Sequence, residues 1–303
     1  MANITSTTAS TAIVKLIAAE ALPMLIGNLV MGNIVNRNYE ATLAKEGDTV
    51  NVPIPPVLSA NTKAINTAVT RQVVAPGNAQ IVLNTHVEAS FAIEDVAKAL
   101  STPDLLNLYM RPAILAIAER IEGDLMGLYS SLTVNTALGL AGTAITEAVI
   151  DSAETTLFNQ KVPVADRKFL VVNGTTYGQI RQITRFSEYR TAQEAGLQAL
   201  LNGNVGKLKD FWVLRSQYVK STGSSPVTVH NLAFGENALA LVIRQLGGAM
   251  PGTGVVQERA EMGNFGLRVT LGYDKDQLAT TCTVDCLYGV GVLRAAHGVE
   301  VNT

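Results

Sequence analysis

The chain has 303 residues, of which 48% are hydrophobic and 16% are charged, which excludes a disordered chain because such chains are polar and highly charged. Its 23 basic and 25 acidic residues give a formal net charge of −2, which argues against a dedicated nucleic-acid binder, since phosphate contacts require clustered positive charge. The length allows a sizeable core and roughly two lobes, at ~100–200 residues per domain.

The apolar region at residues 13–35 is not predicted to be a secretory signal or a membrane span. Residues 1–14 contain no Lys or Arg, so the basic start of a signal is missing. Lys15, Glu20 and Pro23 interrupt the apolar run. We predict a polar, disordered start, then a helix from about Thr11, in a protein made and kept in a cytoplasm.

Residues 36–56, NRNYEATLAKEGDTVNVPIPP, join a charged segment to a strand that ends in prolines. Because proline cannot donate to a sheet ladder, this strand is predicted to lie at a sheet edge or to leave the body of the protein. Residues 57–80 show no helical period and carry turn residues at 76–78. Residues 81–93 then alternate apolar and polar side chains, which predicts one long, half-buried strand.

A strand out, a loop and a strand back predict a long antiparallel arm. There is no acidic residue between Asp48 and Glu88, whereas Lys63 and Arg71 lie near the middle of this segment. Such a loop has little core of its own, so we expect it to gain stability by lying on another molecule.

A long helix is predicted after residues 101–104, STPD, which supply a hydroxyl cap, a first-turn proline and an acid favoured by the helix dipole. Pro112 is expected to kink or restart it, leaving a main helix of about 20 residues, near 30 Å long. Its polar side includes Glu119, Glu122 and Asp124. Two interpretations stay open: a solvated face, or an acidic face that receives the basic arm of a neighbouring copy.

Helices and strands alternate after a linker-like break at 138–144. The predicted elements are helix 146–160, strand 168–172, an Asn173-capped helix to about Ile183, a short helix near 195–201, strands 211–219 and 227–233, and helix 236–245. The tail is predicted to be all β, with strands at 265–273, 278–288, 290–294 and 299–301 and a turn at 274–277.

No motif for catalysis or metal binding is found. His86, His230 and His297 each lack a second ligand-type residue at metal spacing. Cys282 and Cys286 lie about 13 Å apart along a strand, too far to bridge each other, and are predicted to be ordinary apolar residues.

A phosphate-binding loop is also not supported. The segment GNVGK at 203–207 has Leu201 where a first glycine is needed and Leu208 where Ser or Thr is needed. We therefore predict no enzyme activity, no cofactor and no metal.

Five segments occur together in a characteristic order. They are EALPMLIGNLVMGNIVNRNYEATLAKEGDTVNVPIPP (20–56), YMRPAILAIAERIEGDLMGLY (109–129), LLNGNVGKLKDFWVLRSQYV (200–219), HNLAFGENALALVIRQL (230–246) and DCLYGVGVLRAAHGVEV (285–301). In this order they resemble the tailed-phage major capsid proteins of the Hong Kong 97-type fold, in particular the podovirus-like coat branch.

The resemblance implies an α+β fold divided into an N-terminal arm (1–47), an extended β-hairpin loop (48–93), a peripheral domain with a spine helix (94–137), an axial α/β domain (138–250) and further peripheral strands (251–303). It implies self-assembly as hexamers and pentamers into an icosahedral shell around double-stranded phage DNA. The extended loop would lie across an adjacent subunit. The candidate inter-subunit contacts are Arg37, Tyr39, Glu40, Lys63, Arg71, Glu119, Glu122 and Asp124.

The implied partners are other copies of the chain, a portal protein and DNA bound without sequence recognition, with a decoration protein left open and no membrane. The chain lacks a long charged helical extension of the kind that serves some relatives as a built-in scaffold, so a separate scaffolding protein is expected. The chain would be part of the virion after assembly in the bacterial cytoplasm. The alternatives are an encapsulin-type nanocompartment shell, a nucleotide-binding α/β enzyme and a fibre or tail component.

Overall fold

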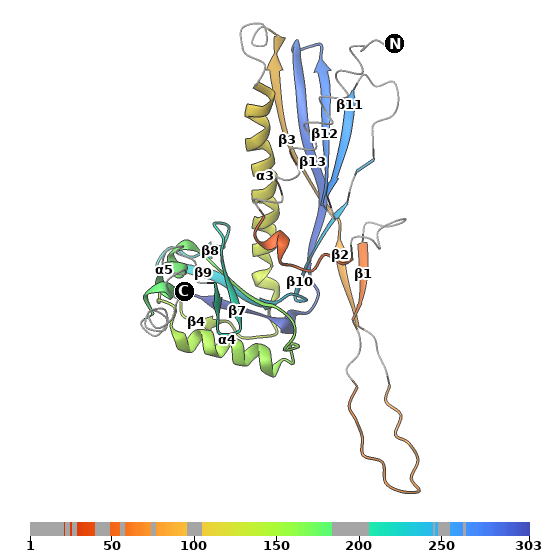
Figure 1. Ribbon diagram of the computed structural model, residues 1–303, viewed down its shortest axis with the longest axis vertical. Helices are drawn as coiled ribbons and strands as arrows, with labels where there is room; N and C mark the ends of the chain where they lie inside the picture. Colours follow the sequence, from red (N-terminus) through yellow and green to blue (C-terminus); the bar gives the residue numbers. More distant parts are fainter. Residues whose placement is uncertain are drawn as a thin grey trace.

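The computed structural model describes residues 21, 25, 29–39, 49–54, 58–73, 77–95, 105–183, 206–244, 246–247, 255–262 and 265–303. The predicted helix start at 101–104, the short helix near 195–201 and Glu40 lie outside these residues. The described chain forms a long sheet backed by one helix, a lobe around a second sheet, and a projecting loop (Figure 1).

The long sheet has five strands, and helix α3 (Leu105–Gly127) lies along one of its faces (Figure 1). Its strand order is β10 (Leu239–Arg244), β13 (Ala279–Val292), β12 (Phe265–Asp274) and β11 (Val256–Met262), with β3 (Thr85–Glu94) also pairing with β13. Alternate β13 side chains, including Cys282 and Cys286, are buried in the core that also holds the apolar face of α3. The prediction that both cysteines are apolar strand residues is confirmed.

Of the kink or restart predicted at Pro112, the restart is wrong, because α3 continues through this residue. Proline inside a helix costs about 3 kcal/mol. Met110 and Ile114, on either side of Pro112, are buried against the sheet, and each such side chain contributes about 1.5–3 kcal/mol. Tertiary burial therefore outweighs the local penalty.

The second sheet has seven strands and forms the core of the lobe. Its order is β4 (Leu138–Gly139), β14 (Gly298–Asn302), β9 (Thr228–Gly235), β5 (Lys168–Val172), β7 (Phe211–Arg215) and β6 (Lys207–Leu208), with β8 (Ser221–Thr222) pairing with β9. Helices α4 (Glu147–Asn159) and α5 (Gly174–Gln182) pack on one face, and the other face meets the core under α3. Short 3-10 turns are η1 (Met31–Asn33), η3 (Leu128–Ser131) and η4 (Ala295–His297).

The helix predicted at 236–245 is wrong, because this segment contains strand β10. Residues 239–243 are buried on both faces, and a continuous apolar run does not by itself distinguish a buried strand from a helix. β10 pairs with β13 in the long sheet, whereas the C-terminal β14 pairs with β9 and β4 in the lobe. The domain boundary predicted at residue 250 therefore does not separate the strands of the long sheet from those of the lobe.

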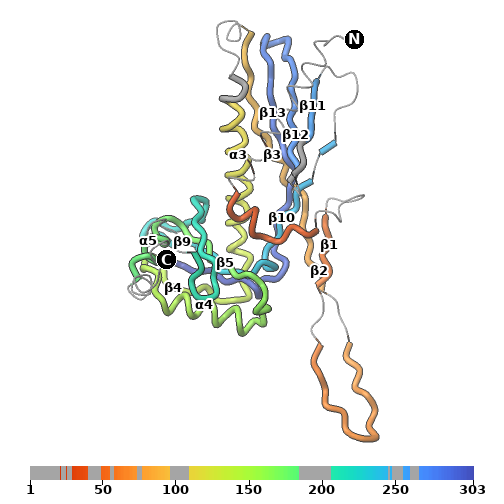
Figure 2. Tube along the Cα trace, viewed as in Figure 1, coloured from red at the N-terminus to blue at the C-terminus, as the bar shows by residue number. Residues whose placement is uncertain are grey.

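The loop base is a two-stranded hairpin of β1 (Thr49–Ile54) and β2 (Gly77–Val82), paired from Thr49↔Val82 to Ile54↔Gly77. The single long strand predicted at 81–93 is instead two strands, because β2 pairs with β1 whereas β3 pairs with β13. Residues 29–39 run from α3 past β10 to this hairpin (Figure 2), and Asn36 forms a bridge to Ala240 on the way.

Gly289 is the point where the hairpin crosses the long sheet. A Cβ at this position would lie 2.4 Å from the Val82 carbonyl oxygen, so backbone would have to move. We expect Gly289→Ala to destabilise the unassembled subunit by about 2 kcal/mol, the usual cost of overpacking.

Chemical unfolding of the purified subunit measures this effect. The control is Gly178→Ala in α5, where a Cβ would meet nothing within 4 Å. If the two variants were equally stable, the close approach of the Val82 backbone would not restrict the residue at position 289 to glycine.

Candidate subunit interface

The end of the projecting loop, residues 58–73, is held together by few contacts. The chain turns at Asn66, whose φ of 62° lies in the left-handed region that asparagine tolerates. The Thr67 hydroxyl donates to the Ala64 carbonyl oxygen at 2.8 Å, and the Ser59 amide donates to Gln72 Oε1 at 3.1 Å. The loop therefore has a defined turn but no core.

Large apolar side chains on this loop face solvent. Ile65 is 92% exposed and Val73 is 96% exposed, and Leu58 and Val69 are also exposed. Clustered apolar exposure on a soluble protein marks an interaction surface. Lys63 and Arg71 are exposed as well, and neither forms an ion pair within the described part of the chain.

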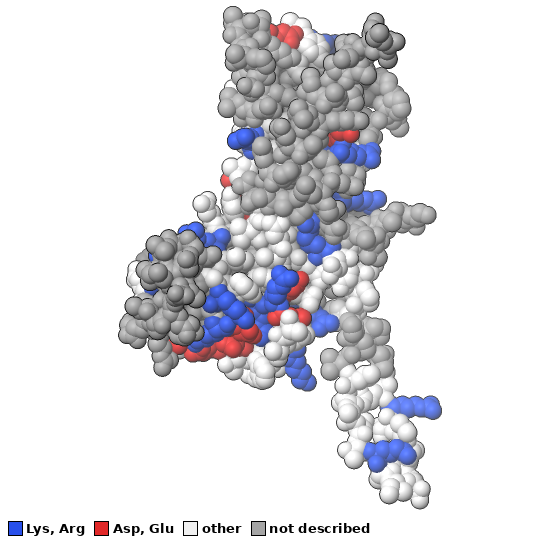
Figure 3. Space-filling model, in the orientation of Figure 1, with Lys and Arg blue, Asp and Glu red and all other residues white. Residues whose placement is uncertain are grey.

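Figure 3 shows Lys and Arg side chains on the loop and no acidic ones, whereas both signs are mixed on the lobe. Lys63 and Arg71 thus lie on one projecting element, residues 58–73, whose exposed side chains include apolar and cationic groups but no acidic ones.

The arm residues lie at the base of the hairpin. Tyr39 packs with Ile54 against the hairpin core, and Arg37 is partly buried. Tyr39 also lines a cavity of about 350 Å³ that reaches His297. Burial lowers the pKa of the His297 imidazole, and neighbouring Arg294 lowers it further.

Two of the three predicted acids of α3 are engaged within the chain but remain near the surface. Glu119 accepts a hydrogen bond from the Tyr218 hydroxyl at 3.0 Å. Asp124 accepts from Arg120 Nε at 3.1 Å and from the Tyr288 hydroxyl at 2.7 Å. Burial raises the pKa of the Tyr288 phenol, and the bond to Asp124 raises it further.

The prediction that Glu122 contacts a neighbouring copy is wrong, because its side chain is fully buried. Its two carboxylate oxygens accept the backbone N–H groups of Met31 and Gly32, each at 3.0 Å. Burial raises the pKa of this carboxyl, although the hydrogen bonds from the backbone oppose the shift. Glu122 therefore ties the N-terminal segment to α3 and is not available to a neighbouring copy.

The spacing in the sequence could have revealed this role. Ala118, Ile121 and Leu125 are buried, and Glu122 lies four residues after Ala118, on the same stripe of the helix. An acid on an apolar stripe is a candidate for a buried hydrogen-bonded group.

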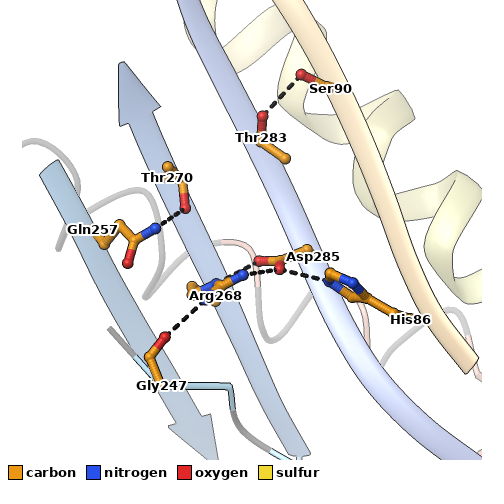
Figure 4. Close-up of polar contacts among 8 residues, drawn as sticks. All are labelled: His86, Ser90, Gly247, Gln257, Arg268, Thr270, Thr283 and Asp285. Atoms are coloured by element: carbon orange, nitrogen blue, oxygen red, sulfur yellow. Dashed lines mark hydrogen bonds and ion pairs between the residues drawn. The ribbon is translucent and has the colours of Figure 1, made fainter. Parts of the chain in front are cut away.

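A polar surface on the long sheet was not predicted from the sequence. Figure 4 shows Asp285 on β13 between Arg268 on β12 and His86 on β3. Asp285 accepts from Arg268 Nε at 2.9 Å and lies 2.8 Å from His86 Nε2. This hydrogen bonding raises the pKa of the Arg268 guanidinium.

This surface, which we call the outer face, is the side of the sheet opposite α3. Ser90 and Thr283 are hydrogen-bonded at 2.8 Å, and Gln257 donates to Thr270 at 3.0 Å (Figure 4). On the outer face, side-chain hydrogen bonds therefore link neighbouring strands in addition to the backbone hydrogen bonds of the sheet.

Among the described residues, no group of three or more His, Cys, Asp or Glu could hold a metal ion. The His230 ring stacks on Tyr129 at 4.1 Å and is hydrogen-bonded to Thr222 and Glu300. No described helix is both long enough and apolar enough to cross a membrane.

The family model described as phage capsid protein matches residues 89–299. No curated protein matches the sequence significantly.

Similar solved structures include one of Mycobacterium phage Che8, with a TM-score of 0.66 and 19% identity over 90% of each chain. The capsid of cyanophage P-SCSP1u is similar with a TM-score of 0.59 and 17% identity, over 84% of this chain and 83% of that chain. A virus-like particle from Pyrococcus furiosus is similar with a TM-score of 0.53 and 10% identity, over 95% of this chain and 99% of that chain.

The family match covers more than half of the chain, and the overall fold is similar to those of the solved phage structures. The chain therefore belongs to the phage capsid protein family, has the Hong Kong 97-type fold and is a major capsid protein that forms the phage shell.

Proposed function

We propose that copies of this chain assemble as hexamers and pentamers into an icosahedral shell around double-stranded DNA, and that each projecting loop lies on an adjacent copy. The observation that supports this arrangement is the exposure of apolar and cationic side chains on residues 58–73. The described loop end has no buried residue of its own, so its apolar groups are stabilised only by a second molecule.

The energy of one such contact is modest. Full burial of a Val, Leu or Ile side chain contributes about 1.5–3 kcal/mol, before the cost of ordering the loop is subtracted. Closed symmetry multiplies this small gain, because each copy gives one loop and receives another. Weak individual contacts therefore suffice for a stable shell.

The remaining partners follow from the same role. A formal net charge of −2 suits a wall that confines DNA without reading its sequence. We propose a separate scaffolding protein and a portal protein as assembly partners, with a decoration protein left open, and assembly in the host cytoplasm before incorporation into the virion. The chain acts structurally, and the family match favours this role over a nanocompartment, an enzyme or a fibre.

The test is expression of the full chain in bacteria, followed by sedimentation and negative-stain microscopy. We expect hexameric or pentameric rings and incomplete shells from the chain alone, and closed shells when a scaffolding protein is supplied. A stable monomer or extended rods would contradict the proposal. Uniform closed shells from the chain alone would contradict only the need for a separate scaffold.

A further inference from the structure

The cavity beside Tyr39, of about 350 Å³, lies at the base of the projecting loop. Its walls come from segments that are far apart in the sequence: Tyr39 and strand β1, the lobe segment 163–166, and the connection 293–297 between β13 and β14. Small-molecule sites in proteins are usually clefts of about 300–1,000 Å³. The cavity is therefore large enough to hold a small ligand between the hairpin and the lobe.

His297 contributes an unsatisfied polar atom to this cavity. The residue is only 6% exposed, and its Nδ1 atom is buried without a hydrogen-bond partner in the described part of the chain. Nearly all buried polar atoms in native proteins have a partner, which a ligand can supply. Burial lowers the pKa of the imidazole, and Arg294 lowers it further, whereas Asp166 opposes the shift. The ring is therefore neutral near pH 7, and a neutral imidazole can accept an N–H donor through Nδ1.

Two side chains of opposite charge lie near this imidazole. Arg294 and Asp166 both line the cavity, and the charges of both act on His297. Neither forms an ion pair within the described part of the chain. Asn237 Nδ2 donates to Asp166 Oδ2 at 3.0 Å, and Asn237 Oδ1 accepts from Asn36 Nδ2 at 2.6 Å, so the carboxylate is held in place. The cavity thus offers one guanidinium and one positioned carboxylate to a ligand.

The hairpin side of the cavity is apolar. Val52 and Leu293 are buried in the core under the hairpin, and Tyr39 and Ile54 pack against the same core. An apolar group of a ligand would gain stability by covering these side chains.

These walls discriminate between classes of ligand. A divalent cation would be repelled by Arg294, and no group of three or more acidic, His or Cys side chains in the described part of the chain could hold it. An inorganic anion would be attracted by Arg294 but repelled by Asp166. A purely apolar molecule would leave His297 Nδ1 without a partner. A molecule that carries a carboxylate, an ammonium group and an apolar side chain matches all the walls.

We propose that this cavity binds a small zwitterion with an apolar side chain, of the size of a free α-amino acid. The carboxylate of the ligand lies on Arg294, and its ammonium group donates to Asp166 and to His297 Nδ1. Its apolar side chain lies on the hairpin. The site is formed within one copy of the chain, so this inference goes beyond the shell function and does not depend on it.

Binding of L-leucine to the full-length, unassembled chain tests the proposal. Equilibrium dialysis with radiolabelled L-leucine should find one site per chain. A saturating concentration should raise the melting temperature by about 2 °C or more, because the ligand contacts segments that are together only in the folded state.

Two analogues of L-leucine test the need for both charges. 4-Methylpentanoate lacks the ammonium group and 3-methylbutylamine lacks the carboxylate, so each should bind at least about tenfold more weakly than L-leucine. Absence of L-leucine binding, or equal binding of either analogue, would overturn the proposal.

Substitutions in the wall locate the charged groups. Arg294→Gln and Asp166→Asn should each weaken L-leucine binding by about tenfold or more, and Asn at position 166 keeps an acceptor for Asn237. The control is Arg181→Gln, at an exposed position on α5, which should bind L-leucine as the wild-type chain does. Thermal melts without the ligand report whether each variant is folded.

NMR of the imidazole groups in the wild-type chain places the ligand without relying on those variants. The chain has three histidines, and L-leucine should shift the signals of His297 while leaving those of His86 and His230 unchanged. His297→Gln assigns the signal. A shift at either other histidine, with none at His297, would place binding outside this cavity and overturn the proposal. None of these measurements requires assembly, so a negative result leaves the shell function unaffected.

Discussion

Removal of residues 59–72, with an Asn-Gly turn in their place, is expected to abolish assembly while leaving the subunit folded. The described end of the loop forms hydrogen bonds only within itself, and its apolar side chains are exposed. Its loss therefore removes no core packing, and the shorter connection costs less entropy to close. Thermal unfolding of the purified subunit should be unchanged within about 2 °C, since no buried group is lost.

Sedimentation and microscopy measure the assembly defect. The matched control replaces residues 59–72 with a Gly/Ser segment of equal length, which keeps the reach of the loop but removes its side chains. We expect this Gly/Ser variant not to assemble either, because the side chains of the loop supply the contact with the adjacent copy. Closed shells from either variant would contradict the role of the loop.

The loop could be predicted from the sequence because its signals are local. Prolines after β1 exclude further ladder pairing, and the absence of acids between Asp48 and Glu88 is visible without a structure. The same holds for strand β5 and for helix α5, whose predicted cap Asn173 accepts the Thr176 amide at 2.7 Å. In each case, residues close in the sequence determine the local structure.

The elements that could not be predicted depend on distant partners. Strand β10 is apolar on both faces, and only its pairing with the end of β13 makes it a strand. The five residues of β14 alternate clearly, yet alternation does not say that Val299 pairs with Ala233 in the lobe. The role of Asp285 as a hydrogen-bond acceptor depends on β12 and β3, which bring Arg268 and His86 beside it.

Loss of the Glu122 carboxylate is expected to have the largest effect on the stability of the subunit. Glu122→Ala leaves the buried N–H groups of Met31 and Gly32 without their acceptor, and each unsatisfied group costs about 1–3 kcal/mol. We expect a total loss of about 3 kcal/mol in the free energy of unfolding of the unassembled chain.

Chemical denaturation measures this loss, with Glu119→Ala as the matched control on the same helix. Glu119 is exposed and forms one hydrogen bond, to Tyr218, so its replacement should cost less than about 1 kcal/mol. Equal losses in the two variants would contradict the buried role of Glu122.

The pH dependence of unfolding reports on the same carboxyl. Burial raises the pKa of Glu122 above its ordinary value of 4.5, so the folded state holds this proton more tightly than the unfolded state does. The resulting stabilisation is present below the ordinary value and is lost as the pH rises through the raised pKa of the folded state. Glu122→Gln keeps one acceptor oxygen and cannot ionise, so its free energy of unfolding does not show this decrease as the pH rises. The wild-type chain should therefore become less stable relative to Glu122→Gln as the pH rises from about 4 to 7, whereas parallel stability profiles would show that burial does not perturb the carboxyl.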